Sequence, residues 1–69
     1  MYKSLSYKKH EKMNEQYLIS LKNKYLNMTN DKYTSFRYSG TEDILRVIIE
    51  GKTKKEINNK KRVIDSLIY

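Results

Sequence analysis

The spacing of hydroxyl and carboxylate residues in the second half of the chain constrains what this sequence can fold into. Ser39 and Glu42 are three residues apart, and Thr53 and Glu56 repeat that spacing. In a capping box, a hydroxyl accepts a hydrogen bond from an unpaired amide at a helix start, and a carboxylate three residues later reaches back. The two pairs therefore predict two helix starts.

The residues that follow each start fit two short helices, at 41–50 and 54–68. Gly51 is expected just past the end of the first one, where a positive φ costs glycine little. Residues 41–50 are apolar on most sides, so this helix is expected to be central and buried. The second helix has an apolar stripe made of Ile57, Ile64, Leu67 and Ile68.

The first half of the chain predicts one longer helix and little else. Apolar and aromatic side chains recur every three or four residues over 10–28, which is the helical period. Residues 32–38 alternate and are rich in tyrosine and threonine, which favours one short strand. Residues 1–9 are polar and basic and are expected to be a flexible arm or an early start of the first helix. The sequence thus predicts a single, mostly α, three-helix domain over 1–69 with at most one strand.

Chain length and composition limit how this domain is stabilised. With 69 residues, a fold buries only about 60% of the surface that its unfolded chain exposes. There is no cysteine and only one histidine, so neither a disulfide framework nor a metal site is expected. Self-association remains, and we expect a homodimer through the first helix and residues 32–38. The expected interface residues are Met13, Tyr17, Leu21 and Tyr25.

The charge balance points to an anionic partner. Fifteen basic residues against eight acidic ones give a net charge of +7, which suits nucleic acid or an acidic protein surface. Catalytic patterns are missing: the single histidine has no fixed acid beside it, and no carboxylates are paired at a useful spacing. We therefore expect a non-enzymatic binding protein without a cofactor.

The second predicted helix and the turn before it carry a cluster of basic residues. Phosphate contacts need mobile cations on one surface, and this segment supplies them. The alternative is that these cations only solvate the outer face of a helix that packs on the core. Three further lysines could act from the N-terminal arm. The predicted nucleic-acid contacts are Lys52, Thr53, Lys54, Lys55, Lys60, Lys61 and Arg62, with Lys3, Lys8 and Lys9 in the arm.

Residues 41–57, TEDILRVIIEGKTKKEI, resemble the first half of a LuxR/GerE-type helix-turn-helix. That family has an acidic-led apolar helix followed by a Glu-Gly turn, a hydroxyl residue and a Glu-Ile pair. The family then continues into a recognition helix, whereas this chain departs from the pattern after Ile57. The resemblance implies a helix-turn-helix outline and a backbone-contact role for Thr53, Lys54 and Lys55.

These observations leave two main functions open. The first is a nucleic-acid-binding regulator, and the composition of the chain, rich in residues with AT-rich codons, suggests a bacterium, a phage or a mobile element. The alternative is a small phage-encoded inhibitor or adaptor that acts on a host protein with an acidic surface. A peripheral membrane helix at 10–28 fits less well, because acidic residues interrupt its lysines. The sequence has neither a spanning segment nor a signal-peptide core, so it predicts a cytoplasmic protein without membrane contact.

Overall fold

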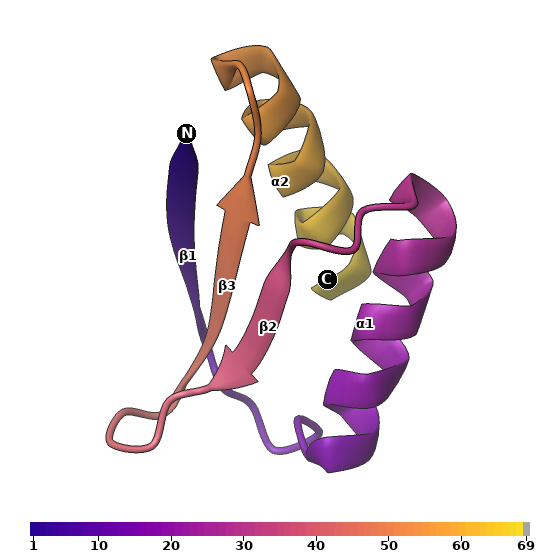
Figure 1. Cartoon of the computed structure of the whole chain (residues 1–69). Coiled ribbons are helices and arrows are strands. Elements are labelled where there is room, and N and C mark those ends of the chain that lie inside the picture. Colours follow the sequence, from indigo (N-terminus) through magenta and orange to yellow (C-terminus); the bar gives the residue numbers. More distant parts are fainter. Residues whose placement is uncertain (69) are drawn as a thin grey trace.

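The computed structural model of this chain describes residues 1–68 and contains three strands and two helices. The strands form one antiparallel sheet in the order β1-β3-β2. Both helices lie on the same side of this sheet (Figure 1). In chain order the elements are β1 (Tyr2–Lys8), α1 (Glu15–Thr29), β2 (Ser35–Tyr38), β3 (Ile44–Glu50) and α2 (Lys54–Ile68).

The mostly α, three-helix prediction is wrong, because residues 44–50 form the central strand β3 rather than a helix. Burial alternates along β3, with Leu45, Val47 and Ile49 fully buried and the residues between them half-buried. Strands on both sides of a central strand also shield its side chains on the uncovered face, which are half-buried here. Its sequence can therefore be apolar at nearly every position. A short apolar run of this kind does not distinguish a strand from a buried helix by periodicity. Its β-branched residues favour the strand.

Ser39 makes the local hydrogen bonds predicted for it, but at a turn between strands. Its hydroxyl accepts from the backbone N–H groups of Thr41, at 3.3 Å, and Glu42, at 3.1 Å. Serine makes such bonds in turns as well as at helix starts. Here they shape the loop that joins β2 to β3, so the helix start predicted at this position is wrong.

The N-terminal segment is a strand, and neither the flexible arm nor the early helix start that the sequence suggested. β1 pairs with β3 along its whole length, with Leu5 opposite Val47. Two further hydrogen bonds extend the ladder: Gly51 N–H donates to Met1 C=O, and Lys9 N–H donates to Asp43 C=O. The pairing partner lies far away in the chain, which a local sequence pattern does not reveal.

The two helices that form lie close to where the sequence predicted them. α2 covers the residues predicted for it, and Thr53 caps it by accepting from Glu56 N–H at 3.1 Å. The Glu56 carboxylate reaches back to Lys52 N–H at 3.0 Å. α1 begins at Glu15, later than predicted, because Asn14 caps it.

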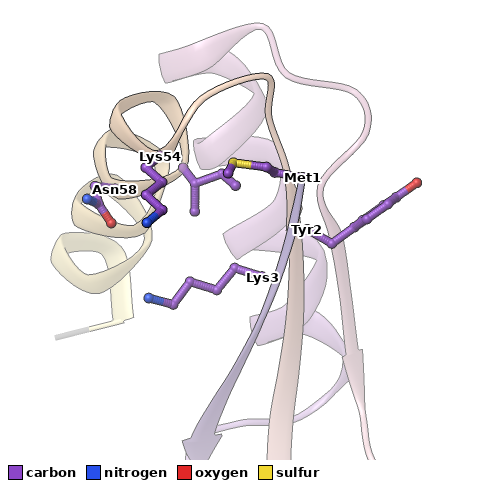
Figure 2. A pocket seen from close by; sticks show the side chains of 6 residues that line it. Met1, Tyr2, Lys3, Lys54 and Asn58 are labelled. Atoms are coloured by element: carbon purple, nitrogen blue, oxygen red, sulfur yellow. The ribbon is translucent and has the colours of Figure 1, made fainter.

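The helix layer is displaced from β1. α2 packs mainly under β3, and α1 packs under β2 and against α2. β1 therefore overhangs, and a pocket of about 300 Å³ opens beside its first residues. Figure 2 shows Lys3 on the helix side of β1, close to Lys54 and Asn58, and Tyr2 on the opposite side.

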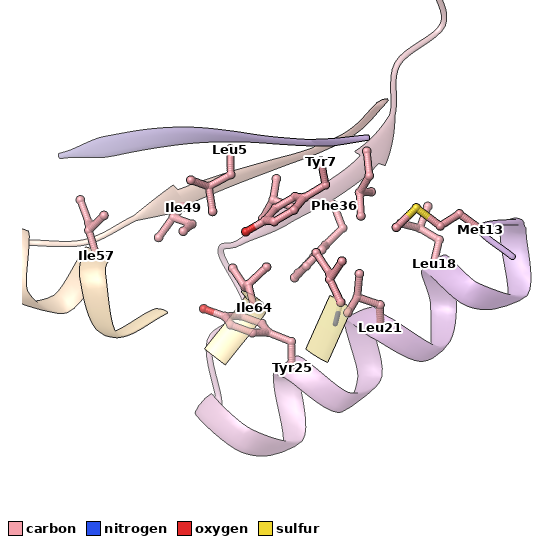
Figure 3. Packing of buried hydrophobic residues seen from close by; sticks show 13 residues of the cluster. Leu5, Tyr7, Met13, Leu18, Leu21, Tyr25, Phe36, Ile49, Ile57 and Ile64 are labelled. Carbon is pink, nitrogen blue, oxygen red and sulfur yellow. The ribbon is translucent and has the colours of Figure 1, made fainter. Parts of the chain in front are cut away.

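The core fills the space between the sheet and the two helices (Figure 3). Tyr25 of α1 is 1% exposed and meets Phe36 of β2 edge to face, with ring centroids 5.4 Å apart. Ile64 of α2 is fully buried. Aromatic side chains supply a large share of the burial in so small a fold. The opposite face of the sheet is covered by no described element.

Candidate nucleic-acid interface

The basic cluster on α2 divides into paired and unpaired cations. Lys60 donates to Glu50 C=O at 2.7 Å and lies 3.2 Å from the Asp31 carboxylate and 3.5 Å from that of Glu56. Lys61 lies 2.7 Å from the Asp65 carboxylate. Lys60 joins α2 to β3 and to Asp31, whereas Lys61 pairs within α2. Both ammonium groups are already engaged, which leaves them poorly placed for phosphate contacts.

Asp65 is held in its ionised form by its neighbours. The hydrogen bond from Lys61, supported by the Tyr7 hydroxyl, lowers the pKa of this carboxyl group below its ordinary value. Asp65 therefore keeps its negative charge at neutral pH and keeps Lys61 occupied. The Thr53 oxygen is likewise engaged in the helix cap. The remaining cations of the predicted set, all exposed, are Lys52, Lys54, Lys55 and Arg62.

The three N-terminal lysines do not act as one arm, because β1 distributes them over different sides of the sheet. Lys3 lies on the helix side near Lys54 (Figure 2). Lys8 falls on the uncovered face, since it alternates with the buried Tyr7. The Lys9 ammonium lies 4.4 Å from the centroid of the Tyr38 ring.

The residues expected at a dimer interface lie in the core of the chain itself. Met13, Leu21 and Tyr25 are buried, and Tyr17 is half-buried. Their helical spacing reflects the packing of α1 on the sheet and α2. In this fold their side chains are not presented to a partner.

The sheet brings together two arginines that the sequence analysis did not connect. Arg46 lies between the buried residues Leu45 and Val47, so its side chain points to the uncovered face. Arg37 follows the buried Phe36 and points the same way. The β2–β3 register places Arg37 directly opposite Arg46.

These two cations lack strong acidic partners. The Arg46 guanidinium is 3.9 Å from Glu42, whose side chain is 63% exposed, so this contact is weak. Within residues 1–68, Arg37 has no carboxylate at ion-pair distance. Like charges directly opposite each other destabilise an antiparallel pair by a fraction of a kcal/mol, roughly 0.2–1. An anion bound between the two arginines would remove that repulsion.

The β2–β3 loop completes a hollow next to the arginine pair. Its volume is about 350 Å³ and its surroundings are polar, with the Ser39 hydroxyl and the open backbone at Gly40 nearby. Guanidinium groups bind phosphate oxygens in pairs of hydrogen bonds. The lining residues are Arg37, Tyr38, Ser39, Gly40, Thr41 and Arg46.

The rest of the uncovered face is suited to contact with an extended ligand. The register places Ser4 and Ser35 on either side of Ile48, and Ser6 beside Arg46. Ile48 is half-buried and the serines are exposed. Only the pairing of distant strands gathers these residues, so no local sequence signal could have found them.

The aromatic residues of 33–38 do not form a platform of stacked rings on the uncovered face. Phe36 is buried in the core, and the Tyr38 hydroxyl donates to Asn14 C=O at 2.7 Å. Tyr33 is exposed but precedes β2. Phe36 is therefore a core residue, and the side chains of β2 on the uncovered face are those of Ser35 and Arg37.

Other kinds of site find little support in the described residues. Over 1–68, no three or more histidine, aspartate or glutamate side chains gather in a metal-binding arrangement. No described helix has the length and apolar character needed to cross a bilayer. Comparison of the chain with protein-family models, curated proteins and solved structures found no match.

Proposed function

We propose that this chain is a small, non-enzymatic, nucleic-acid-binding protein that contacts phosphates through the uncovered face of its sheet. The observation that carries the proposal is the placement of Arg37 opposite Arg46, beside the polar hollow of the β2–β3 loop. Two guanidinium groups at opposed strand positions, with only a weak contact from Arg46 to Glu42, are costly for the free protein and useful for an anion.

The shape of the face favours an extended polyanion over a single small anion. Lys8 lies on the same face, at the end of β1 that pairs with Ile44. The cations thus run across the strands at one end of the sheet. The rest of the face carries serine hydroxyls together with Tyr2, Ile48 and Glu50. A nucleic-acid backbone presents repeated phosphates that such a row can follow.

The cations of α2 that have no carboxylate partner within residues 1–68 form a second basic surface. The outer side of α2 faces away from the sheet, so one straight segment of nucleic acid does not reach both surfaces. The surface around Lys54 and Lys55 is therefore the alternative binding site to the sheet face. Mutations in one surface or the other can show which of them binds nucleic acid.

The test is the salt dependence of binding to duplex and single-stranded oligonucleotides, followed by fluorescence anisotropy. In Arg37→Gln/Arg46→Gln, the log–log salt slope should fall by about 0.9 for every phosphate that a duplex no longer pairs with an arginine, or by about 0.7 for a single strand. The matched control is Lys22→Gln/Lys24→Gln, which removes the same charge from exposed positions of α1. The control should keep the slope of the wild-type protein.

Two results would count against the proposal. If the arginine variant binds like the control while Lys54→Gln/Lys55→Gln loses the slope, the contact surface is α2. If the wild-type protein shows no salt-sensitive affinity for either oligonucleotide, nucleic-acid binding is excluded. The inhibitor or adaptor function then becomes the leading alternative.

A further inference from the structure

The outer edge of β1 presents unpaired backbone groups along the whole strand. In an antiparallel pair, alternate residues direct their N–H and C=O groups to the partner strand. The bonds at Met1 and Lys9 fix this alternation, so the odd-numbered residues of β1 bond to β3. The groups that point outward therefore belong to Tyr2, Ser4, Ser6 and Lys8.

Little in the structure protects this edge. β1 is seven residues long and contains no proline, and Ser4 and Ser6 are small and exposed. On the helix side, α2 reaches β1 through Asp65 and Lys61, but no described strand pairs with the outer edge of β1. An exposed strand edge of this length is a template for pairing with another strand.

We propose that β1 pairs antiparallel with β1 of a second copy of this chain, giving a continuous six-stranded sheet. The outward N–H and C=O groups belong to even-numbered residues, so each even-numbered residue must lie opposite an even-numbered residue of the second copy. The register that pairs all of residues 2–8 places Ser4 opposite Ser6 of the second copy. Tyr2 then lies opposite Lys8, and Leu5 lies opposite Leu5 at the two-fold axis. All outward N–H and C=O groups of residues 2–8 gain partners.

The charges of the strand fit this register. Lysine commonly protects sheet edges because like charges repel, but here each lysine of the strand faces a tyrosine. Lys3 comes opposite Tyr7 of the second copy, on the helix side of the sheet. A shift of two residues in one direction would set Lys3 opposite Lys9, and a shift in the other would leave Lys8 without a partner.

In this arrangement, a hollow beneath β1 would allow Lys3 of the second copy to form an ion pair with Asp65. The hollow has a volume of about 380 Å³ and is bounded by Leu5, Tyr7, Lys61 and Asp65. The Tyr7 hydroxyl donates to Asp65, so the Lys3 side chain of the second copy would arrive beside this carboxylate. A carboxylate has acceptor sites for both lysines. The two-fold axis repeats the contact, and the edge is thus complementary to itself.

Sedimentation velocity over the micromolar range tests the dimer with two variants at one position. The N–H group of Ser6 points outward, so Ser6→Pro removes that group without removing a hydrogen bond to β3. Proline is tolerated at such positions of an edge strand. Ser6→Thr keeps that N–H. The wild-type protein and Ser6→Thr should shift from monomer to dimer as concentration rises, and Ser6→Pro should stay monomeric. A wild-type protein that is monomeric throughout, or a Ser6→Pro variant that dimerises equally, would overturn the proposal.

Cross-linking tests the register even if the proline variant does not fold. The chain has no cysteine, so only introduced thiols react. An equimolar mixture of Ser4→Cys and Ser6→Cys should form a disulfide-linked dimer on mild oxidation, since opposite positions lie within disulfide reach. Either variant alone should cross-link poorly, because its own thiols lie two residues out of register. Equal cross-linking in all three samples, or none in the mixture, would contradict this pairing. Neither experiment depends on nucleic-acid binding.

Discussion

The ammonium group of Lys60 lies 3.2 Å from the carboxylate of Asp31, and this contact ties α2 to the segment between α1 and β2. Both side chains are largely removed from solvent, with 17% and 6% exposed. Asp31 also accepts from the Tyr25 hydroxyl at 2.8 Å, from the Thr34 hydroxyl and from Tyr33 N–H at 2.9 Å. A single carboxylate thus connects both helices to the start of β2.

We expect this contact to make folding sensitive to acid. Burial raises the pKa of Asp31, but its hydrogen bonds, led by Thr34, outweigh burial and lower the pKa from 3.8 to about 2. The folded chain therefore binds this proton less tightly than the unfolded chain. The stabilisation, about 2 kcal/mol, is present above about pH 4 and is lost as pH falls toward 2.

Asp31→Asn should remove most of that acid dependence and lower stability at neutral pH by a similar amount, about 2 kcal/mol. Urea unfolding at several pH values measures both effects. The control is Asp43→Asn, an identical change at an exposed position. Equal losses in the two variants would show that the Asp31 contacts contribute nothing specific.

Neighbouring residues of β3 should respond differently to the same substitution. Ile49 is fully buried and Ile48 is half-buried on the opposite face. Ile49→Ala should cost roughly 2–5 kcal/mol because it leaves a cavity in the core. Ile48→Ala should cost clearly less. Thermal and urea unfolding of the two variants give the comparison, and similar losses would contradict the alternation of a strand.

Gly51 should tolerate a side chain poorly, for a reason other than the one its sequence position suggests. Its φ is not positive, so it does not terminate a helix. A Cβ atom there would meet Cγ1 of Ile57 at 3.0 Å, in the first turn of α2. Gly51→Ala should therefore destabilise the fold by roughly 1–3 kcal/mol through overpacking.

Gly40 provides the matched comparison for that substitution, since a Cβ atom there would have nothing within 4 Å. Gly40→Ala should leave the unfolding midpoint nearly unchanged. Calorimetry of both variants is sufficient. A Gly51→Ala variant as stable as Gly40→Ala would mean that Ile57 moves aside without cost.

The arginine pair should oppose stability while it supports binding. Arg37→Thr removes a like charge opposite Arg46 and adds a residue that favours strands. At low salt this variant should be more stable than the wild-type protein by roughly 0.2–1 kcal/mol. Its affinity for oligonucleotides should fall.

The relevant measurements are urea unfolding at low and high salt, beside binding at one salt concentration. Added salt screens exposed charges, so the gain in stability should shrink as salt rises. A variant that loses stability and binding together would indicate that Arg37 has a structural role instead.

The local signals of the sequence predicted the two helices that form, α1 and α2, but they also predicted a helix at 41–50, where β3 lies. Thr53 and Glu56 are close neighbours in the chain, and their capping bonds form wherever a helix follows. The apolar spacing of α1 likewise reflects one face of a single helix. These features depend on neighbouring residues, so they could be read without the rest of the fold.

The sequence by itself determined the position of α2, the core face of α1 and the basic character of the molecule. Tertiary structure decided that residues 44–50 extend, because β3 gains backbone partners on both edges from β1 and β2. It also decided which cations lie beside carboxylates, since Lys60 and Lys61 meet them while Arg37 lies opposite Arg46. Strand pairing joins residues far apart in the chain, and its register is set by the shared burial of one sheet face.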